Sequence, residues 1–167
     1  GDLWVSYSVN KEDMWISRIP VPVEINASAH ADDDFSNNKS ITELTDWNIY
    51  SPVWAPVSLE GQWLKLQDKD PFDYAKVERK IPASKELKVS FDLKAGQNDK
   101  GTLQIEFLDE NGIACSRMEL TDDGIFRMKG GSRFANMMKY EAGKVYHVEA
   151  VLSTADRNIQ VYVDGKR

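Results

Sequence analysis

The chain has 167 residues and a formal net charge of −6, from 21 basic and 27 acidic residues. This balance argues against a nucleic-acid partner, because non-specific affinity for nucleic acid comes from clustered lysine and arginine. No apolar run approaches the roughly 20 residues that span a bilayer, so we expect no membrane span. Five tryptophans, six tyrosines and six phenylalanines exclude disorder over the whole chain.

Residues 1–25 predict a β-hairpin. Leu3, Val5 and Tyr7 recur at every second position, which is the period of a strand. A polar stretch follows, and residues 14–19 indicate a second strand. Pro20 ends this strand, because proline cannot donate a hydrogen bond to a neighbouring strand.

Residues 26–46 are small and polar, with almost no apolar periodicity, and predict a linker or a long loop. One short helical turn is expected between Ile41 and Trp47. Ser40 is its predicted N-cap, and Glu43 stands at the spacing of a capping box.

Residues 47–167 predict an antiparallel β-sandwich. Apolar and polar residues alternate in short runs separated by turn signals, as expected when one face of each strand packs on a partner sheet and the other meets water. The clearest runs are residues 88–94, 103–107, 113–120, 125–129, 146–152 and 159–163.

Three segments between these runs carry further expectations. Asn111-Gly112 suits the positive φ angles of a type I′ hairpin turn. The less regular stretch from Arg133 to Tyr140 is interpreted as a loop that crosses the sheet. Asp164-Gly165 is a turn signal with no strand after it, so we expect the sandwich to lack its last strand.

Two runs near the end of the sequence resemble a known family. Residues 144–150, Lys-Val-Tyr-His-Val-Glu-Ala, and residues 161–166, Val-Tyr-Val-Asp-Gly-Lys, are similar to paired strands of the concanavalin/laminin-G-like jelly-roll domains. The resemblance implies an all-β, concanavalin-like jelly roll over residues 47–167. It implies little about function, because this fold hosts lectins, accessory modules and hydrolases.

The hairpin resembles a different family. Ser8, Asn10, Glu12 and Trp15 fall at the spacing of the Asp box found in blades of neuraminidase (sialidase)-type β-propellers, with Ser8 and Trp15 matching its consensus. The order of hairpin, linker and sandwich is similar to the C-terminal part of a bacterial multidomain glycoside hydrolase. The resemblance implies a secreted or periplasmic protein whose own propeller domain is a partner of this chain. It carries no catalytic residue onto these positions.

Acidic clusters are the first candidates for chemistry. Asp68, Asp70, Asp73 and Glu78 are close in sequence, and paired carboxylates at suitable separations hydrolyse glycosides. The same residues are ordinary turn formers, and this is the favoured interpretation. Calcium bound by these residues or by residues 32–34 is a weaker alternative. We otherwise expect no metal and no cofactor.

Histidine and cysteine offer no nucleophilic site. His147 is out of phase with the apolar residues of its strand and is expected to face away from them, and His30 lies in the polar zone. No Ser–His–Asp arrangement follows from these spacings. Cys115, the only cysteine, is expected to be a buried and inert thiol, and it excludes both an internal disulfide and a multi-cysteine zinc site.

Aromatic residues support a sharper hypothesis. Five tryptophans and tyrosines fall between positions 47 and 74, and such rings stack on the apolar faces of sugars while polar neighbours bind the hydroxyl groups. Core packing is the alternative for each of them. The predicted carbohydrate-binding residues are Trp54, Trp63, Tyr74 and Arg133.

The functional prediction is therefore a non-catalytic accessory domain of a bacterial glycan-degrading, sialidase-like enzyme, which either binds carbohydrate or braces its neighbours. Two alternatives remain open at this stage. One is a glycoside hydrolase module acting on its own, and the other is a purely structural spacer between domains.

Overall fold

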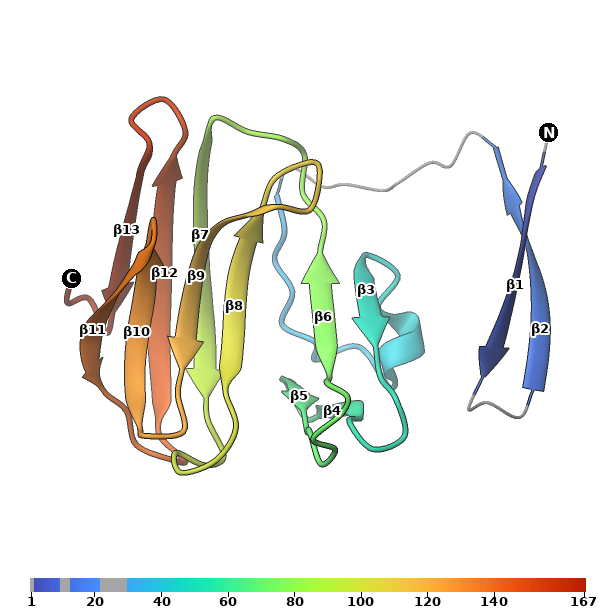
Figure 1. Ribbon diagram of the computed structural model, residues 1–167, viewed down its shortest axis with the longest axis horizontal. Coiled ribbons are helices and arrows are strands. Elements are labelled where there is room, and N and C mark those ends of the chain that lie inside the picture. The colour runs from blue at the N-terminus through green and yellow to red at the C-terminus, as the bar shows by residue number, and fades with distance from the viewer. Residues whose placement is uncertain (1, 10–12, 22–29) are drawn as a thin grey trace. The chain divides into compact units, whose positions relative to one another are not determined.

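The computed structural model describes residues 2–9, 13–21 and 30–167. The chain divides into two compact units, residues 1–82 and residues 83–167. Within the described ranges the secondary structure is strand apart from one short 3₁₀ helix, and no helix there is long and apolar enough to cross a membrane. Figure 1 shows the strands in chain order.

The first unit begins with the predicted hairpin, which the structure confirms. β1 (Asp2–Val9) pairs antiparallel with β2 (Asp13–Pro20). Trp4 and Ile16 share one face of this pair, and Tyr7 and Trp15 share the other, because alternate residues point to opposite sides of a strand. Each face of the hairpin therefore carries aromatic side chains. Asn10 and Glu12 of the Asp-box resemblance lie outside the described residues.

Two further strand pairs and one helical turn complete the first unit. They are β3 (Trp47–Tyr50) with β6 (Lys76–Arg79), β4 (Val57–Glu60) with β5 (Trp63–Leu66), and the 3₁₀ helix η1 (Ile41–Glu43). The predicted cap is confirmed, since the Ser40 side chain accepts from the Thr42 backbone N–H. Glu43 accepts from the backbone N–H of Lys39, the residue before the cap, at 2.9 Å, which differs from the predicted capping box, where the acceptor binds the N–H of Ser40 itself.

Arg79 joins the loop before β3 to the β3–β6 pair. Its Nε donates to Asp33 Oδ2 at 3.0 Å, and its two terminal nitrogens donate to the side chain and backbone oxygens of Asp46, each at 3.3 Å. The Trp47 indole N–H donates to the same Asp33 oxygen at 3.2 Å. The Arg79 side chain is only 13% exposed, so these charge-assisted bonds are shielded from much of the solvent.

The second unit is a β-sandwich, which confirms the predicted fold class. Its sheets have the strand orders β11-β10-β9-β8 and β13-β12-β7, all neighbours antiparallel. The chain changes sheet between β7 and β8 and again between β11 and β12 (Figure 1). The strands are β7 (Glu86–Lys94), β8 (Leu103–Leu108), β9 (Ala114–Leu120), β10 (Ile125–Gly130), β11 (Arg133–Lys139), β12 (Val145–Ser153) and β13 (Asn158–Val163).

The core of the sandwich receives alternate residues from both sheets. Met118 and Phe126 of one sheet and Val148 of the other are its largest fully buried side chains. Tyr140 and Tyr146 lie at the core beside the second change of sheet. The Tyr140 hydroxyl donates to the Thr121 carbonyl at 2.7 Å, and the Tyr146 hydroxyl accepts from the Glu141 backbone N–H at 2.9 Å. Both rings are thus buried without leaving their hydroxyl groups unpaired.

The stretch from Arg133 to Tyr140 was predicted to be a loop, and this is wrong. Residues 133–139 form β11, paired with β10. Phe126 lies opposite Met138 while Arg127 lies opposite Asn136, so Met137 is the extra residue of a β-bulge. The bulge interrupts the two-residue period, and for this reason the strand has no alternating pattern to recognise.

The predicted burial of Cys115 is also wrong, because this residue is exposed. Ser116, Met118 and Leu120 of β9 face the core, so Cys115 points outward and its thiol donates to the Phe107 carbonyl at 3.1 Å. His147 follows the same rule and is exposed, as predicted, with its Nδ1 2.8 Å from Asp92.

The type I′ turn lies elsewhere than predicted. Asn111 is not among the described residues with positive φ, and the Asp109 side chain instead accepts from the backbone N–H groups of Asn111 and Ile113. These two bonds hold the pKa of Asp109 below its usual range, with the Ile113 bond the larger cause. Asp164 and Gly165 both have positive φ, and Val163 bridges to Lys166 across them.

Arg79→Lys is expected to destabilise the first unit by about 1–2 kcal/mol, because a lysine cannot reproduce the fork that binds Asp33 and Asp46 together. All five tryptophans lie between residues 4 and 63, so tryptophan fluorescence during urea unfolding follows this unit alone. The exposed Arg133→Lys is the control and is expected to leave the fluorescence transition in place. Coincident transitions for Arg79→Lys and the unsubstituted protein would contradict the role assigned to Arg79.

Tyr140→Phe is expected to destabilise the sandwich by about 1 kcal/mol, since the buried Thr121 carbonyl loses one of its two donors and keeps the Gly124 N–H at 3.1 Å. Unfolding followed by far-ultraviolet circular dichroism measures this change. Tyr162→Phe is the matched control, because its hydroxyl only donates to the half-buried Gln160 side chain. An equal loss of stability in both variants would show that the buried hydrogen bond of Tyr140 stabilises the sandwich no more than the partly buried bond of Tyr162.

Candidate functional site

The β3–β6 pair presents two faces of different chemistry. Asn48 and Tyr50 of β3 lie opposite Glu78 and Lys76 of β6, and these four side chains share one face. The other face carries Trp47 and Arg79, which bind the preceding loop. The strand period therefore directs one set of side chains inward and leaves the first set accessible.

Tyr50 is fixed on the accessible face by a carboxylate. Its hydroxyl donates to Asp73, at 3.0 Å from Oδ1 and 3.3 Å from Oδ2. The hydrogen bond from Tyr50 to the Asp73 carboxylate is the main cause that raises the pKa of Tyr50 above 10, since it stabilises the protonated phenol. The Tyr50 and Tyr74 rings lie 5.3 Å apart at 48°, a tilted aromatic pair. Tyr50 is 47% exposed and Tyr74 is 58% exposed.

Phe72 stands beside this pair and is 95% exposed. Its loop is held by successive aspartate side chains. Asp68 accepts from the Asp70 backbone N–H, and Asp70 accepts from the Phe72 backbone N–H, both at 2.9 Å. A large apolar ring is thus presented to solvent from a fixed turn, beside two other exposed rings. An exposed apolar patch of this kind is unfavourable in water and is typical of a binding site.

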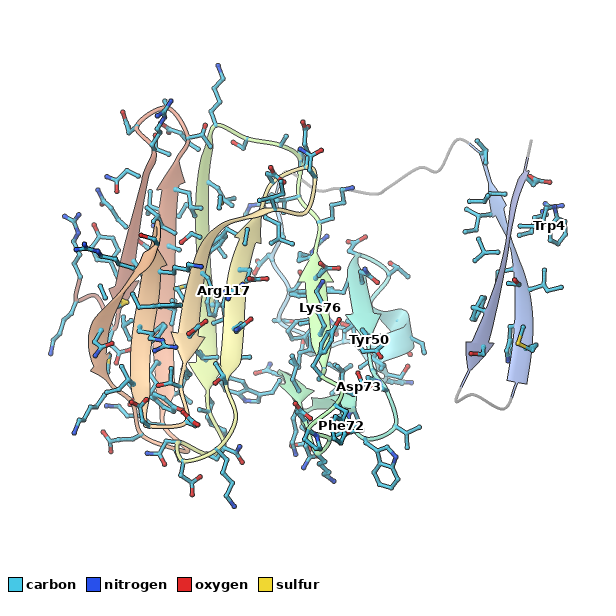
Figure 2. The ribbon with its side chains drawn as sticks, viewed as in Figure 1. Trp4, Tyr50, Phe72, Asp73, Lys76 and Arg117 are labelled. Carbon is cyan, nitrogen blue, oxygen red and sulfur yellow. The ribbon has the colours of Figure 1, made fainter. Side chains whose placement is uncertain are left out.

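Hydrogen-bonding groups continue along the same face. Glu78 accepts from the Asn48 side chain at 2.9 Å and pairs with Lys76 Nζ at 2.7 Å. Figure 2 shows Tyr50, Phe72, Asp73 and Lys76 beside β3 and β6. We call this surface the tyrosine face. Its members are Asn48, Tyr50, Phe72, Asp73, Tyr74, Lys76 and Glu78.

The four predicted binding residues lie in different settings. Tyr74 is part of the tyrosine face. Trp54 is 67% exposed, and its carbonyl accepts from the Lys69 backbone N–H at 2.9 Å, which holds its turn beside the loop that leads to Phe72. Trp63 is half-buried in β5, and Arg133 is exposed at the start of β11 in the second unit.

Sequence reasoning missed Tyr50, Phe72 and Asp73 as members of one site. Tyr50 was grouped with the other aromatics and Asp73 with the acidic turn, but nothing linked them. The available signal was Phe72 itself, since an apolar ring between Asp70-Pro71 and Asp73 lies in a turn where it has little chance of burial.

The acidic candidates serve local structure. Asp68 and Asp70 stabilise their own turn, as favoured from the sequence, and Asp33 binds Arg79 and Trp47. Asp34 accepts from the backbone and side chain of Ser36, and the backbone bond is the larger cause that lowers the pKa of Asp34. Within residues 2–9, 13–21 and 30–167, no group of three potential metal ligands comes together.

The outer face of the four-stranded sheet holds a second polar cluster. The Glu119 side chain is 4% exposed and pairs with Arg127 at 2.7 Å and Arg117 at 3.6 Å. The Gln104 side chain also donates to Glu119, and the Arg127 guanidinium lies 4.2 Å from the centre of the Phe134 ring. The buried carboxylate is thus compensated by neighbours on its own sheet. Unlike Phe72 and Tyr74, the Phe134 ring is covered by a charged side chain.

Asp73→Asn is expected to lower the pKa of Tyr50 toward 10, because the carboxylate that stabilises the protonated phenol is removed. Absorbance at 295 nm during an alkaline titration measures this pKa, and Tyr50→Phe identifies the signal by removing it. Asp156→Asn, which changes a carboxylate bonded to Ser153 in the second unit, is the control. A raised pKa favours the Tyr50–Asp73 bond at neutral pH, and the bond is lost as the pH rises through that raised value. An unchanged Tyr50 titration in Asp73→Asn would show that the bond is absent in solution.

Comparison with known proteins places this geometry in context. A family model described as "Sialidase-like, CBM domain", where CBM stands for carbohydrate-binding module, matches residues 47–167. No curated protein matches the chain. A solved structure titled "Sialidase" is similar over all of the chain, with 91% sequence identity and a TM-score of 0.89, and the chain spans 15% of that protein.

The matched region starts at Trp47, includes every member of the tyrosine face and continues through the sandwich. The match confirms the prediction of an accessory domain associated with a sialidase-like protein. The chain belongs to the sialidase-like carbohydrate-binding module family.

Proposed function

We propose that the tyrosine face is the carbohydrate-binding site of this module. The observation that carries the proposal is the exposed and anchored group of Tyr50, Phe72 and Tyr74. Pyranose rings have apolar C–H faces that pack on aromatic rings, and the adjacent Asp73, Lys76 and Glu78 supply acceptors and a donor for sugar hydroxyls. Anchoring by Asp73 reduces the conformational entropy that Tyr50 loses on binding.

The wider setting is part of the same proposal. The chain is the accessory domain of a larger, secreted or periplasmic bacterial protein that degrades sialylated glycans. The 91% identity to a chain titled "Sialidase" supports this setting. The module holds that protein on its glycan, while catalytic residues lie elsewhere in the full-length protein.

The finer structural relationships also belong to the proposal. Within residues 47–167, the β-sandwich is a concanavalin/laminin-G-like jelly roll, and residues 26–46 link this region to the hairpin. Residues 1–25 are the closing hairpin of the protein's own propeller. Apolar residues on both faces of β1–β2, with Trp4 63% exposed and Trp15 54% exposed, suit a strand pair that is covered on two sides in a blade.

Phe72→Ala and Tyr74→Ala are each expected to weaken glycan binding about 10-fold, the loss of one stacking ring. Isothermal titration calorimetry with the best ligands from a glycan array measures the effect. Ile113→Ala removes an equally accessible apolar side chain from the second unit and is the control, since Ile113 is 66% exposed. Circular dichroism establishes that each variant is folded.

Two outcomes would overturn this proposal. Unchanged binding in both variants, with a loss in Trp54→Ala or Trp63→Ala, would move the site to the predicted tryptophans. A folded chain that binds no glycan on the array would favour the structural spacer predicted as an alternative.

A further inference from the structure

The segment that carries the exposed rings of the tyrosine face has an excess of negative charge. Residues 68–78 carry four carboxylates, Asp68, Asp70, Asp73 and Glu78, against two ammonium groups, Lys69 and Lys76. The segment that carries the exposed rings therefore has a net charge of −2. A sugar carboxylate placed on these rings would lie within about one Debye length, roughly 8 Å in physiological salt, of several like charges.

The nearby cations do not cancel this negative charge. Lys76 Nζ is 2.7 Å from Glu78 Oε1, so its charge is largely compensated within the face. Lys80 lies six residues after Tyr74 along an extended segment, a separation of about 20 Å. At that distance its attraction for a ligand on the rings is screened by salt.

The tyrosine face also has no arginine. Bidentate hydrogen bonding by a guanidinium is the usual way in which proteins bind a carboxylate. The arginine of β6 is Arg79, which points to the opposite face and donates to Asp33 and Asp46. The acceptors that remain, the oxygens of Asp73 and Glu78, suit the hydroxyl groups of an uncharged sugar.

We infer that the tyrosine face binds a neutral hexose or N-acetylhexosamine and excludes sialic acid. The inference rests on the proposed carbohydrate-binding function of this face. The module then holds a glycan by the uncharged sugars that become terminal when a sialic acid is removed. Binding in this way keeps the protein on glycans that it has already trimmed, close to those that still carry sialic acid.

The test uses one oligosaccharide before and after removal of its terminal sialic acid. In calorimetric titrations at low salt, the desialylated form is expected to bind at least five-fold more tightly. The preference is expected to shrink as salt is raised, because screening weakens the repulsion of the sialic acid carboxylate.

Asp70→Asn provides the matched charge variant. The asparagine side chain retains an oxygen that accepts from the Phe72 backbone N–H, so the turn is kept while one negative charge is removed. In this variant, the ratio of the affinities for the desialylated and sialylated forms is expected to fall about two-fold. Glu110→Gln removes an exposed carboxylate from the second unit and is expected to leave the preference unchanged.

The outcomes separate this inference from the proposed function. Equal or tighter binding of the sialylated form, still weakened by Phe72→Ala, would overturn the neutral-sugar inference and leave the tyrosine face as the site. Binding of neither form would count against both. A preference that Asp70→Asn and Glu110→Gln reduce equally would also overturn the inference, because the selection would then not arise from the charges beside the rings.

Discussion

The orientation of the tyrosine face depends on the hydrogen bonds of Arg79. Among the described residues of the first unit only Leu44, Ala55 and Val57 are buried apolar side chains, too few to fix a pair of four-residue strands by packing alone. The Arg79 guanidinium supplies the missing constraint by binding Asp33 and Asp46, which lie 46 and 33 residues earlier in the chain. With one face of β3–β6 held in this way, Tyr50 and Lys76 are left accessible.

The sandwich of the second unit is stabilised by a different balance of forces. Alternate residues of both sheets build an apolar core. The Tyr140 hydroxyl binds the backbone of the turn between β9 and β10, and the Tyr146 hydroxyl binds the backbone where the chain changes sheet. Much of this unit can be predicted from sequence because apolar and polar residues alternate along β7, β8 and most of β12. Two predictions failed for local reasons. The bulge at Met137 hides the alternation of β11, so this strand was predicted as a loop. Cys115 was predicted to be buried, but its position in β9 directs its side chain away from the core.

The candidate site was less predictable than the fold. Tyr74 and the anchoring aspartates were recognisable as residue types, but β3 and β6 have only four residues each and lie 25 residues apart in sequence, so no periodicity reveals that Tyr50 and Asp73 meet. The sequence also did not show which tryptophans are buried. Trp63 and Trp54 are equal candidates by sequence, whereas the structure leaves Trp54 exposed and half-buries Trp63.

The carboxylates on and beside the tyrosine face have two effects, and deleting one of these side chains removes both effects at once. Asp73 anchors Tyr50, and Asp70 holds the turn that presents Phe72, so both position the rings. Their charges also disfavour an anionic ligand on those rings. A face built with amides would keep much of the geometry and lose the repulsion. If the tyrosine face binds carbohydrate as proposed, the use of aspartate at these positions couples the positioning of the rings to the choice of an uncharged sugar, and such a ligand would cover the exposed phenyl ring of Phe72.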